Sequence, residues 1–201
     1  MKTIRYTKMD TDEIIRILEN GGLIAFPTDT VFGLGCVMEE EPIKKIYEAK
    51  GRSFDKPLPM MCDSLSMIEK VAYVNEKAEK IISRFVPGPL TLIFNKKECV
   101  EDYVTMNKKT IGIRVPDDPF ILEMISKMGR PLMVTSANIS GDGSLLRWED
   151  VYECMNGKID GIVCEDAAGF EASTIVDVTG EDICVLREGP VSLKELQEAI
   201  Q

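Results

Sequence analysis

The segment Phe26-Pro27-Thr28-Asp29-Thr30-Val31-Phe32-Gly33-Leu34-Gly35 is the most informative stretch of this chain of 201 residues. Its hydroxyl and carboxylate side chains directly follow an apolar run, residues 23–26, that is typical of a buried strand. Polar groups in that position can bind a small polar ligand, and Gly33 and Gly35 would let the backbone turn sharply or approach the ligand closely. A plain turn, in which Thr and Asp side chains cap local backbone groups, explains the same residues equally well.

The chemistry available to the chain is limited, because it contains no histidine. This excludes Ser-His-Asp and Cys-His catalysis, His-ligated zinc and His proton shuttling. Gly33-Leu34-Gly35 lacks the third glycine and the following helix of a dinucleotide-binding fingerprint, and no P-loop run is present. The remaining Lys, Arg, Ser, Thr, Asp and Asn side chains suit phosphate chemistry, in which positioning and charge neutralisation supply most of the catalysis.

Composition and length indicate one globular domain over residues 1–201, since 44% of the residues are hydrophobic and 29% are charged. No apolar run approaches the ~20 residues of a membrane-spanning helix, and the N-terminus does not resemble a signal peptide. We therefore expect a cytoplasmic protein without membrane association, with its six cysteines as reduced thiols. The net charge of -10 disfavours a protein that binds nucleic acid over a broad face, but it allows a local basic cleft.

Strand and helix patterns alternate irregularly along the chain, and several expected strands have no helix between them. This favours a layered α/β (α+β) domain with a mixed sheet over a strict βαβ series. We expect a capping box at Asp10-Thr11-Asp12-Glu13 to open the first helix. Further helices are predicted over residues 42–49, 64–71, 75–85, 119–128, 148–155 and 192–200, and strands over 23–26, 90–94, 110–115, 132–135, 161–164, 173–178 and 183–187. Polar groups gather at strand ends and in the following loops, where open sheets bind ligands.

A basic loop follows the second expected helix, with Lys50, Arg52 and Lys56 close together among Gly and Pro residues. Arg presents a planar fork to phosphate oxygens and Lys a point charge, so the loop could bind a triphosphate. A solvated surface loop is the alternative.

Further polar groups follow or end other strands. Ser136 and Asn138 could contact a nucleotide without adding charge, or form a capping turn. Arg114 and Arg187 each end an apolar strand, where they either pair with a carboxylate or face an anionic ligand. Together with the hydroxyls at Ser173 and Thr174, these groups indicate a cleft for an anion, most simply a nucleotide.

These segments, in this order, resemble the YrdC family, the threonylcarbamoyl-AMP synthases. The resemblance spans nearly the whole chain, and its motifs together are highly specific. They are the segment from Phe26 to Gly35, Lys50-Gly51-Arg52, Pro87-Gly88-Pro89-Leu90-Thr91, Ile111-Gly112-Ile113-Arg114-Val115-Pro116, Ser136-Ala137-Asn138-Ile139-Ser140-Gly141, Ser173-Thr174-Ile175-Val176-Asp177 and Arg187-Glu188-Gly189.

The resemblance implies a three-layer domain, with a twisted mixed sheet flanked by helices and a deep basic cavity. It implies that L-threonine, bicarbonate and ATP, with Mg2+ bound through the nucleotide, yield threonylcarbamoyl-AMP and pyrophosphate. Partner proteins would transfer the threonylcarbamoyl group to the adenosine at tRNA position 37, and a weak contact with tRNA or double-stranded RNA is a further expectation.

Family roles carry over to this sequence position by position. Thr30, Arg114 and Ser173 would hold threonine. Lys50, Arg52, Ser136 and Asn138 would form the catalytic group. The ATP site would comprise Lys50, Arg52, Lys56, Thr110, Ser136, Asn138, Ser144 and Arg187, with no protein-bound metal.

The chain departs from the family pattern at a few positions. Many relatives carry a histidine near Met61, and this chain has none. Thr135, Asp29 and Phe32 replace a common Pro, Glu and Tyr, and the length corresponds to the single-domain form. Two other functions fit some of the same features: a non-catalytic, double-stranded-RNA-binding or ribosome-associated translation factor, and a carbamoyl-adenylate enzyme that uses carbamoyl phosphate.

Overall fold

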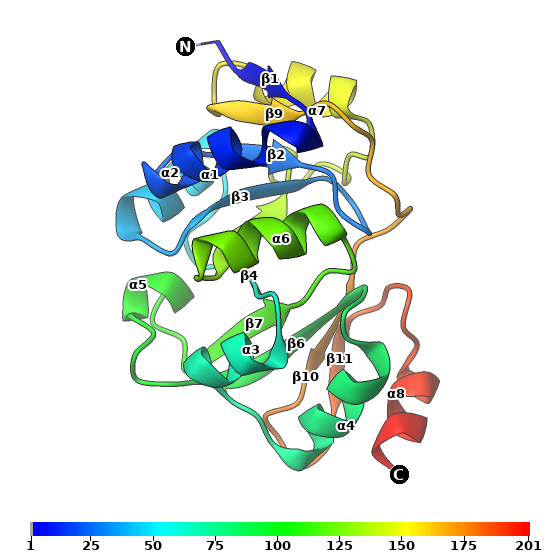
Figure 1. Ribbon diagram of the computed structural model, residues 1–201. Helices are drawn as coiled ribbons and strands as arrows, with labels where there is room; N and C mark the ends of the chain where they lie inside the picture. The colour runs from blue at the N-terminus through cyan, green and yellow to red at the C-terminus, as the bar shows by residue number, and fades with distance from the viewer. Residues whose placement is uncertain (1) are drawn as a thin grey trace.

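The fold is built on one mixed sheet, which runs from β1 and β9 at the top of Figure 1 to β10 and β11 at the bottom. The structure, a computed structural model, describes residues 2–201. The hydrogen-bonded order of the strands is β1-β9-β2-β3-β8-β4-β7-β6-β10-β11, and β5 pairs with β6. The strands are β1 (Ile4–Tyr6), β2 (Ile24–Phe26), β3 (Gly33–Val37), β4 (Met60–Met61), β5 (Ala72–Tyr73), β6 (Leu90–Lys96), β7 (Thr110–Arg114), β8 (Leu132–Ser136), β9 (Gly161–Val163), β10 (Thr174–Asp177) and β11 (Cys184–Arg187).

Helices flank this sheet, so the expected α/β class with a mixed sheet is confirmed (Figure 1). They are the 3-10 helix η1 (Lys8–Asp10) and the α-helices α1 (Thr11–Glu19), α2 (Glu40–Lys50), α3 (Leu65–Val71), α4 (Glu76–Phe85), α5 (Asp102–Thr105), α6 (Pro119–Met128), α7 (Trp148–Met155) and α8 (Leu193–Ile200). Helix α6 crosses the middle of the sheet next to α1, and α8 packs against α4. Within residues 2–201, no helix combines the length and the apolar character that a membrane crossing requires.

Local capping explains why several helix bounds agree with the sequence patterns. Asp118 accepts hydrogen bonds from the backbone N–H groups of Phe120 and Ile121, and Pro119 occupies the first turn of α6. Gly129 then ends the helix in the left-handed conformation, at a φ of 64°. These signals fix α6 at residues 119–128, as predicted.

The expected capping box at Asp10-Thr11-Asp12-Glu13 is wrong, because Asp10 makes no side-chain cap to α1. The box forms one turn earlier, where Thr7 and Asp10 cap the short helix η1 reciprocally. Helix α2 also begins at Glu40, before the predicted start at Pro42. Proline is tolerated there because the N–H groups of a first helical turn have no intrahelical partner. The same helix extends to Lys50, which therefore lies at a helix end and not in the loop.

Strand β3 was not predicted, and it contains the two glycines that were expected to allow a sharp turn or a close approach. Gly33 and Gly35 pair with Phe26 and Ile24 of β2 in a regular antiparallel register. A Cβ atom on Gly35 would lie 2.7 Å from Cε1 of Phe26. The glycines therefore make room for the buried Phe26 ring against the neighbouring strand, and no tight turn occurs at them.

Candidate active site

A cavity of about 270 Å³ lies over one face of the sheet. Its floor consists of alternate residues in or next to four strands, because side chains two positions apart point to the same face of a sheet. These floor residues are Thr91 and Ile93, Gly112 and Arg114, Val134 and Ser136, and Ser173 and Ile175. Arg114 and Ser136 end their strands and Ser173 directly precedes one, whereas the other floor residues lie within strands.

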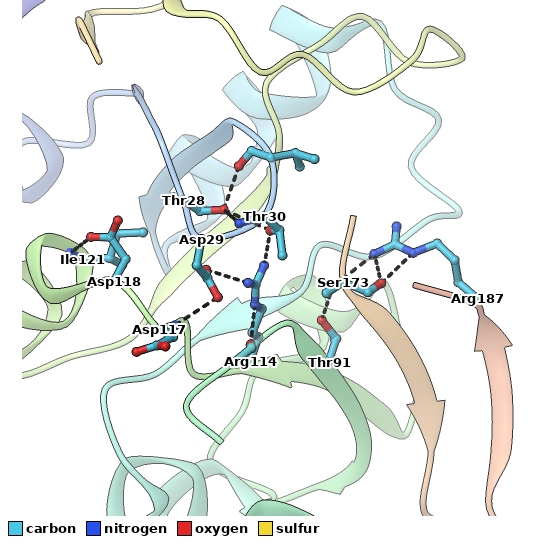
Figure 2. A network of polar contacts seen from close by, with 12 residues as sticks. Thr28, Asp29, Thr30, Thr91, Arg114, Asp117, Asp118, Ile121, Ser173 and Arg187 are labelled. Carbon is cyan, nitrogen blue, oxygen red and sulfur yellow. Dashed lines mark hydrogen bonds and ion pairs between the residues drawn. The ribbon is translucent and has the colours of Figure 1, made fainter. Parts of the chain in front are cut away.

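Arg114, one of these floor residues, is held in a fixed position (Figure 2). Its Nη2 lies 2.6 Å from Oδ1 of Asp29, its Nη1 donates to Oγ1 of Thr30 at 2.6 Å, and its Nε donates to the carbonyl of Gly88 at 3.1 Å. Burial lowers the pKa of Arg114, and the adjacent Asp29 carboxylate opposes that shift. A guanidinium group has five N–H donors. Within the described part of the chain, three of them have a hydrogen-bond partner, and two have none.

The loop before β3 combines the two roles that the sequence left open. Thr28 caps local backbone groups, since its Oγ1 donates to the carbonyl of Val31 at 2.7 Å and accepts from the N–H of Thr30 at 3.0 Å. Thr30 and Asp29 instead hold Arg114, and the second oxygen of Asp29 accepts from the N–H of Asp117 at 3.1 Å. The turn therefore holds Asp29 and Thr30 in position to contact Arg114.

A second arginine, Arg187, lies at the right of Figure 2, next to Ser173. Its Nε and Nη2 donate to the carbonyl of Ser173 at 3.0 and 2.7 Å, and the Ser173 hydroxyl lies 2.9 Å from that of Thr91. Burial lowers the pKa of Arg187. Thr91 was not singled out as a site residue from the sequence. The available signal was its place at the end of the quoted Pro87–Thr91 motif.

The loop after α2 is shaped by the backbone carbonyl of Lys56. Tyr47 Oη and Arg52 Nε both donate to that carbonyl, at 2.8 and 3.0 Å, and the ring of Tyr47 stacks on Phe54. This arrangement brings Arg52 to the cavity lining, while the side chain of Lys56 is exposed. The predicted basic loop is therefore ordered by packing, and it contributes one cation to the cavity.

Lys50 lies beneath the cavity, with only 1% of its surface exposed. Its ammonium group donates to the carbonyls of Ser136 and Asn138 and to Oδ1 of Asn138. Asn138 is also buried, and its amide nitrogen donates to the carbonyls of Ile139 and Asp142. Burial, followed by repulsion from Arg52, lowers the pKa of Lys50 to about 8.

Most of the predicted site residues come together at this cavity. Those that line it are Thr30, Arg52, Arg114, Ser136, Ser144, Ser173 and Arg187. Lys50 and Asn138 lie behind this lining, and Lys56 lies outside it. Thr110 is also outside, but it stands two positions before Gly112 on β7, so its side chain points to the same face of the sheet. Among the described residues, three arginines and no acidic side chain line the cavity.

Comparison with known proteins gives the family. The family model Sua5_yciO_yrdC, described as "Telomere recombination", matches residues 16–189. The chain belongs to the Sua5/YciO/YrdC family. This confirms the resemblance drawn from the motifs.

Curated relatives of this Sua5/YciO/YrdC chain carry related names. It is 35% identical to a putative threonylcarbamoyl-AMP synthase of Methanocaldococcus jannaschii, over 97% of this chain and 96% of that protein. It is 39% identical to the threonylcarbamoyl-AMP synthase of Pyrococcus abyssi, over 91% of this chain and 55% of that protein. The chain therefore spans nearly all of the first relative but only about half the length of the second.

Solved structures agree with the family. The crystal structure of P. abyssi Sua5 complexed with L-threonine matches with a TM-score of 0.91 and 36% identity, covering 99% of this chain and 60% of that one. Escherichia coli YciO matches with a TM-score of 0.83 and 24% identity, covering 97% of this chain and 98% of that one, and so shares the fold.

Proposed function

We propose that this Sua5/YciO/YrdC chain is an L-threonylcarbamoyladenylate synthase, which condenses L-threonine, bicarbonate and ATP to threonylcarbamoyl-AMP and pyrophosphate. The observation that carries the proposal is the set of arginines around one cavity. Arg114 is preorganised by Asp29 and Thr30, while Arg52 and Arg187 line the same space. An amino-acid carboxylate and a triphosphate are the anionic groups that such a site suits.

The threonine half of the site would lie at Thr30, Arg114 and Ser173. The two remaining N–H groups of Arg114 can donate to the carboxylate of L-threonine as a charge-assisted pair. The hydroxyl of Ser173 is already oriented by Thr91 and Arg187. Met61 lines the cavity where many relatives carry a histidine, so an apolar thioether faces the substrate in this chain.

The ATP half would lie at Arg52, Ser136, Ser144 and Arg187, with Lys56 and Thr110 beside it. The arginines offset charge on the phosphates, and the hydroxyls orient the nucleotide. The described lining offers hydroxyls but no carboxylate, and this donor set suits a Mg2+ ion that arrives bound to ATP. Mg2+ would neutralise phosphate charge there.

The reaction needs no histidine. The neutral amine of threonine attacks CO2 and releases a proton, or attacks bicarbonate and releases water, to give a carbamate. One carbamate oxygen then attacks the α-phosphorus of ATP. The bond from that phosphorus to the bridging oxygen breaks, and pyrophosphate leaves. Since the carbamate is already an anion, an enzymic base is not obligatory for the attack. Fixed donors at the developing charge are each worth about 3 kcal/mol, so Arg52→Ala should slow turnover roughly a hundredfold or more.

Pyrophosphate release, with each substrate omitted in turn, tests the proposal. We expect release that requires ATP, L-threonine and bicarbonate together, with Arg52→Ala reducing it strongly and Arg114→Ala mainly raising the threonine requirement. Release without threonine or bicarbonate would refute the proposed reaction. Binding of double-stranded RNA by a protein without turnover would support the translation-factor alternative instead, and dependence on carbamoyl phosphate would support the carbamoyl-adenylate alternative.

The product of the proposed reaction is an activated carbamoyl group that another protein must use. We propose that partner proteins transfer it to the adenosine at tRNA position 37. A weak contact of this chain with tRNA or double-stranded RNA belongs to the same proposal.

A further inference from the structure

We infer that Lys50 and Asn138 act on the reaction without touching ATP: the buried Lys50 ammonium fixes the loop that presents Ser136 and Ser144 to the nucleotide. This makes Lys50 a positioning residue behind the cavity wall. The inference rests on the proposed function and assigns these two residues a different role from the nucleotide contact that the family resemblance implied.

The geometry uses every hydrogen of the ammonium group. Lys50 Nζ donates to the carbonyl of Ser136, to the carbonyl of Asn138 at 2.6 Å and to Oδ1 of Asn138 at 3.1 Å. An ammonium group has three donors, so none is left for a phosphate while these bonds persist. Lys50 is also 1% exposed and is not part of the cavity lining.

These contacts belong to one hydrogen-bond network, which we call the Lys50 knot. It joins Lys50 to Ser136, Asn138 and the loop up to Asp142. Oγ of Ser136 donates to Oδ1 of Asn138 at 2.5 Å, and Nδ2 of Asn138 donates to the carbonyl of Asp142 at 2.7 Å. The backbone carbonyl of Lys50 accepts the N–H of Ser140 at 2.9 Å, which ties the end of α2 to the loop a second time. Only Ser136 in this knot reaches the cavity, and the loop continues from it to Ser144. Lys50 can therefore influence the nucleotide through the position of these hydroxyls.

The charge of Lys50 is an essential part of the knot. Within the described chain, no carboxylate forms a salt bridge with it, and oxygen atoms of the loop are its hydrogen-bond acceptors. The ionisable groups that act on it are Arg52, which disfavours its charge, and the Cys154 thiol of α7, which favours it. With the pKa of Lys50 lowered to about 8, loss of its proton weakens the knot in mildly alkaline solution. Nucleotide affinity should fall over the same pH range.

A double-mutant cycle between Lys50→Met and Ser136→Ala tests the inference, with Lys44→Met as the matched control because Lys44 lies on the same helix with 44% of its side chain exposed. ATP dissociation constants and pyrophosphate release are measured for all proteins. We expect each single variant to raise the ATP dissociation constant roughly tenfold. The dissociation constant of the double variant should be no more than about twofold above that of the single variant that binds ATP less tightly. Lys44→Met should bind ATP as the wild type does. Multiplying effects would show that Lys50 contacts the nucleotide independently, and would overturn the inference.

A second variant, Asn138→Asp, keeps the test decisive if Lys50→Met fails to fold. A carboxylate beside the Lys50 ammonium should favour its charged form. The alkaline fall in ATP affinity near pH 8 should therefore move upward by about one pH unit or more in Asn138→Asp. An unchanged midpoint would overturn the inference. ATP binding is measured without threonine, so a failure of the proposed reaction would appear separately, as missing turnover in the wild type.

Discussion

The pair of Arg114 and Asp29 supports a quantitative prediction about stability. The substitution Asp29→Asn preserves the shape of the side chain but removes its charge. In the structure, Nη2 of Arg114 lies 2.6 Å from Oδ1 of Asp29, and the two side chains are 6% and 12% exposed. The change therefore leaves a buried guanidinium without its counter-ion, while its hydrogen bonds to Thr30 and Gly88 persist.

The magnitude follows from this geometry. Breaking a buried ion pair by removing one partner costs about 3–5 kcal/mol. Because the amide oxygen of the substituted side chain could still accept one hydrogen bond, and Arg114 keeps two other acceptors, we expect a loss of about 2–3 kcal/mol. For a domain of this size, each kcal/mol lowers Tm by about 2–4 °C, so Tm should fall by ~4–12 °C.

Thermal unfolding followed by circular dichroism measures this shift. Asp117→Asn is the matched control, since Asp117 is exposed and contributes only its backbone N–H to Asp29. We expect the control to melt within ~1 °C of the wild type. A similarly small shift for Asp29→Asn would refute the view that this carboxylate stabilises the buried Arg114.

Three further predictions concern packing, thiols and ligands. A Cβ on Gly35 would meet the buried ring of Phe26 at 2.7 Å, so Gly35→Ala should lower the unfolding free energy by about 1–3 kcal/mol. Gly143→Ala is the control, because a Cβ there would lie in open space and should change the unfolding free energy little. Equal denaturation midpoints for the two variants would contradict this prediction. Burial raises the pKa of Cys62 to about 12, so a thiol reagent at pH 8 should modify exposed Cys184 and spare Cys62, as peptide mass spectrometry can check. L-threonine with MgATP, each at about 100 times its Kd, should raise the unfolding free energy by at least ~2.7 kcal/mol; no rise in Tm would argue against binding to the folded state.

Much of the fold could be predicted from local signals. Helices α6 and α7 agree with the sequence patterns, because the caps of α6 and the apolar spacing of both helices are encoded within the segments themselves. Strands β1 and β3 could not be predicted in this way. β1 is short and largely exposed, while the glycines of β3 suppress the usual strand signal. Their role depends on the ring of Phe26 in the adjacent strand, and a pattern along one segment does not report such cross-strand packing.

The site was predictable in composition and only partly in arrangement. The motifs gave Thr30, Arg114 and Arg187, which the structure brings to one cavity. The sequence did not show that Lys50 turns inward to hydrogen-bond the carbonyl groups of a loop, since its neighbour Arg52 has the same charge and faces the cavity. Which of two nearby cations contacts a ligand depends on the tertiary contacts of the helix end that carries them.

The position of β9 in the sheet determines the order in which strands can pair while the chain is synthesised on the ribosome. β9 fills the place between β1 and β2, and Gly161 pairs with both Ile4 and Ile24. The strand β1 is therefore synthesised early but stays without its hydrogen-bonded neighbour until residues 161–163 have emerged. During that interval, the apolar β2 has an open edge, which is a template for wrong pairing. Ser173 and Arg187 emerge later still, so a nascent chain can acquire the cavity only after residue 187 has left the ribosome.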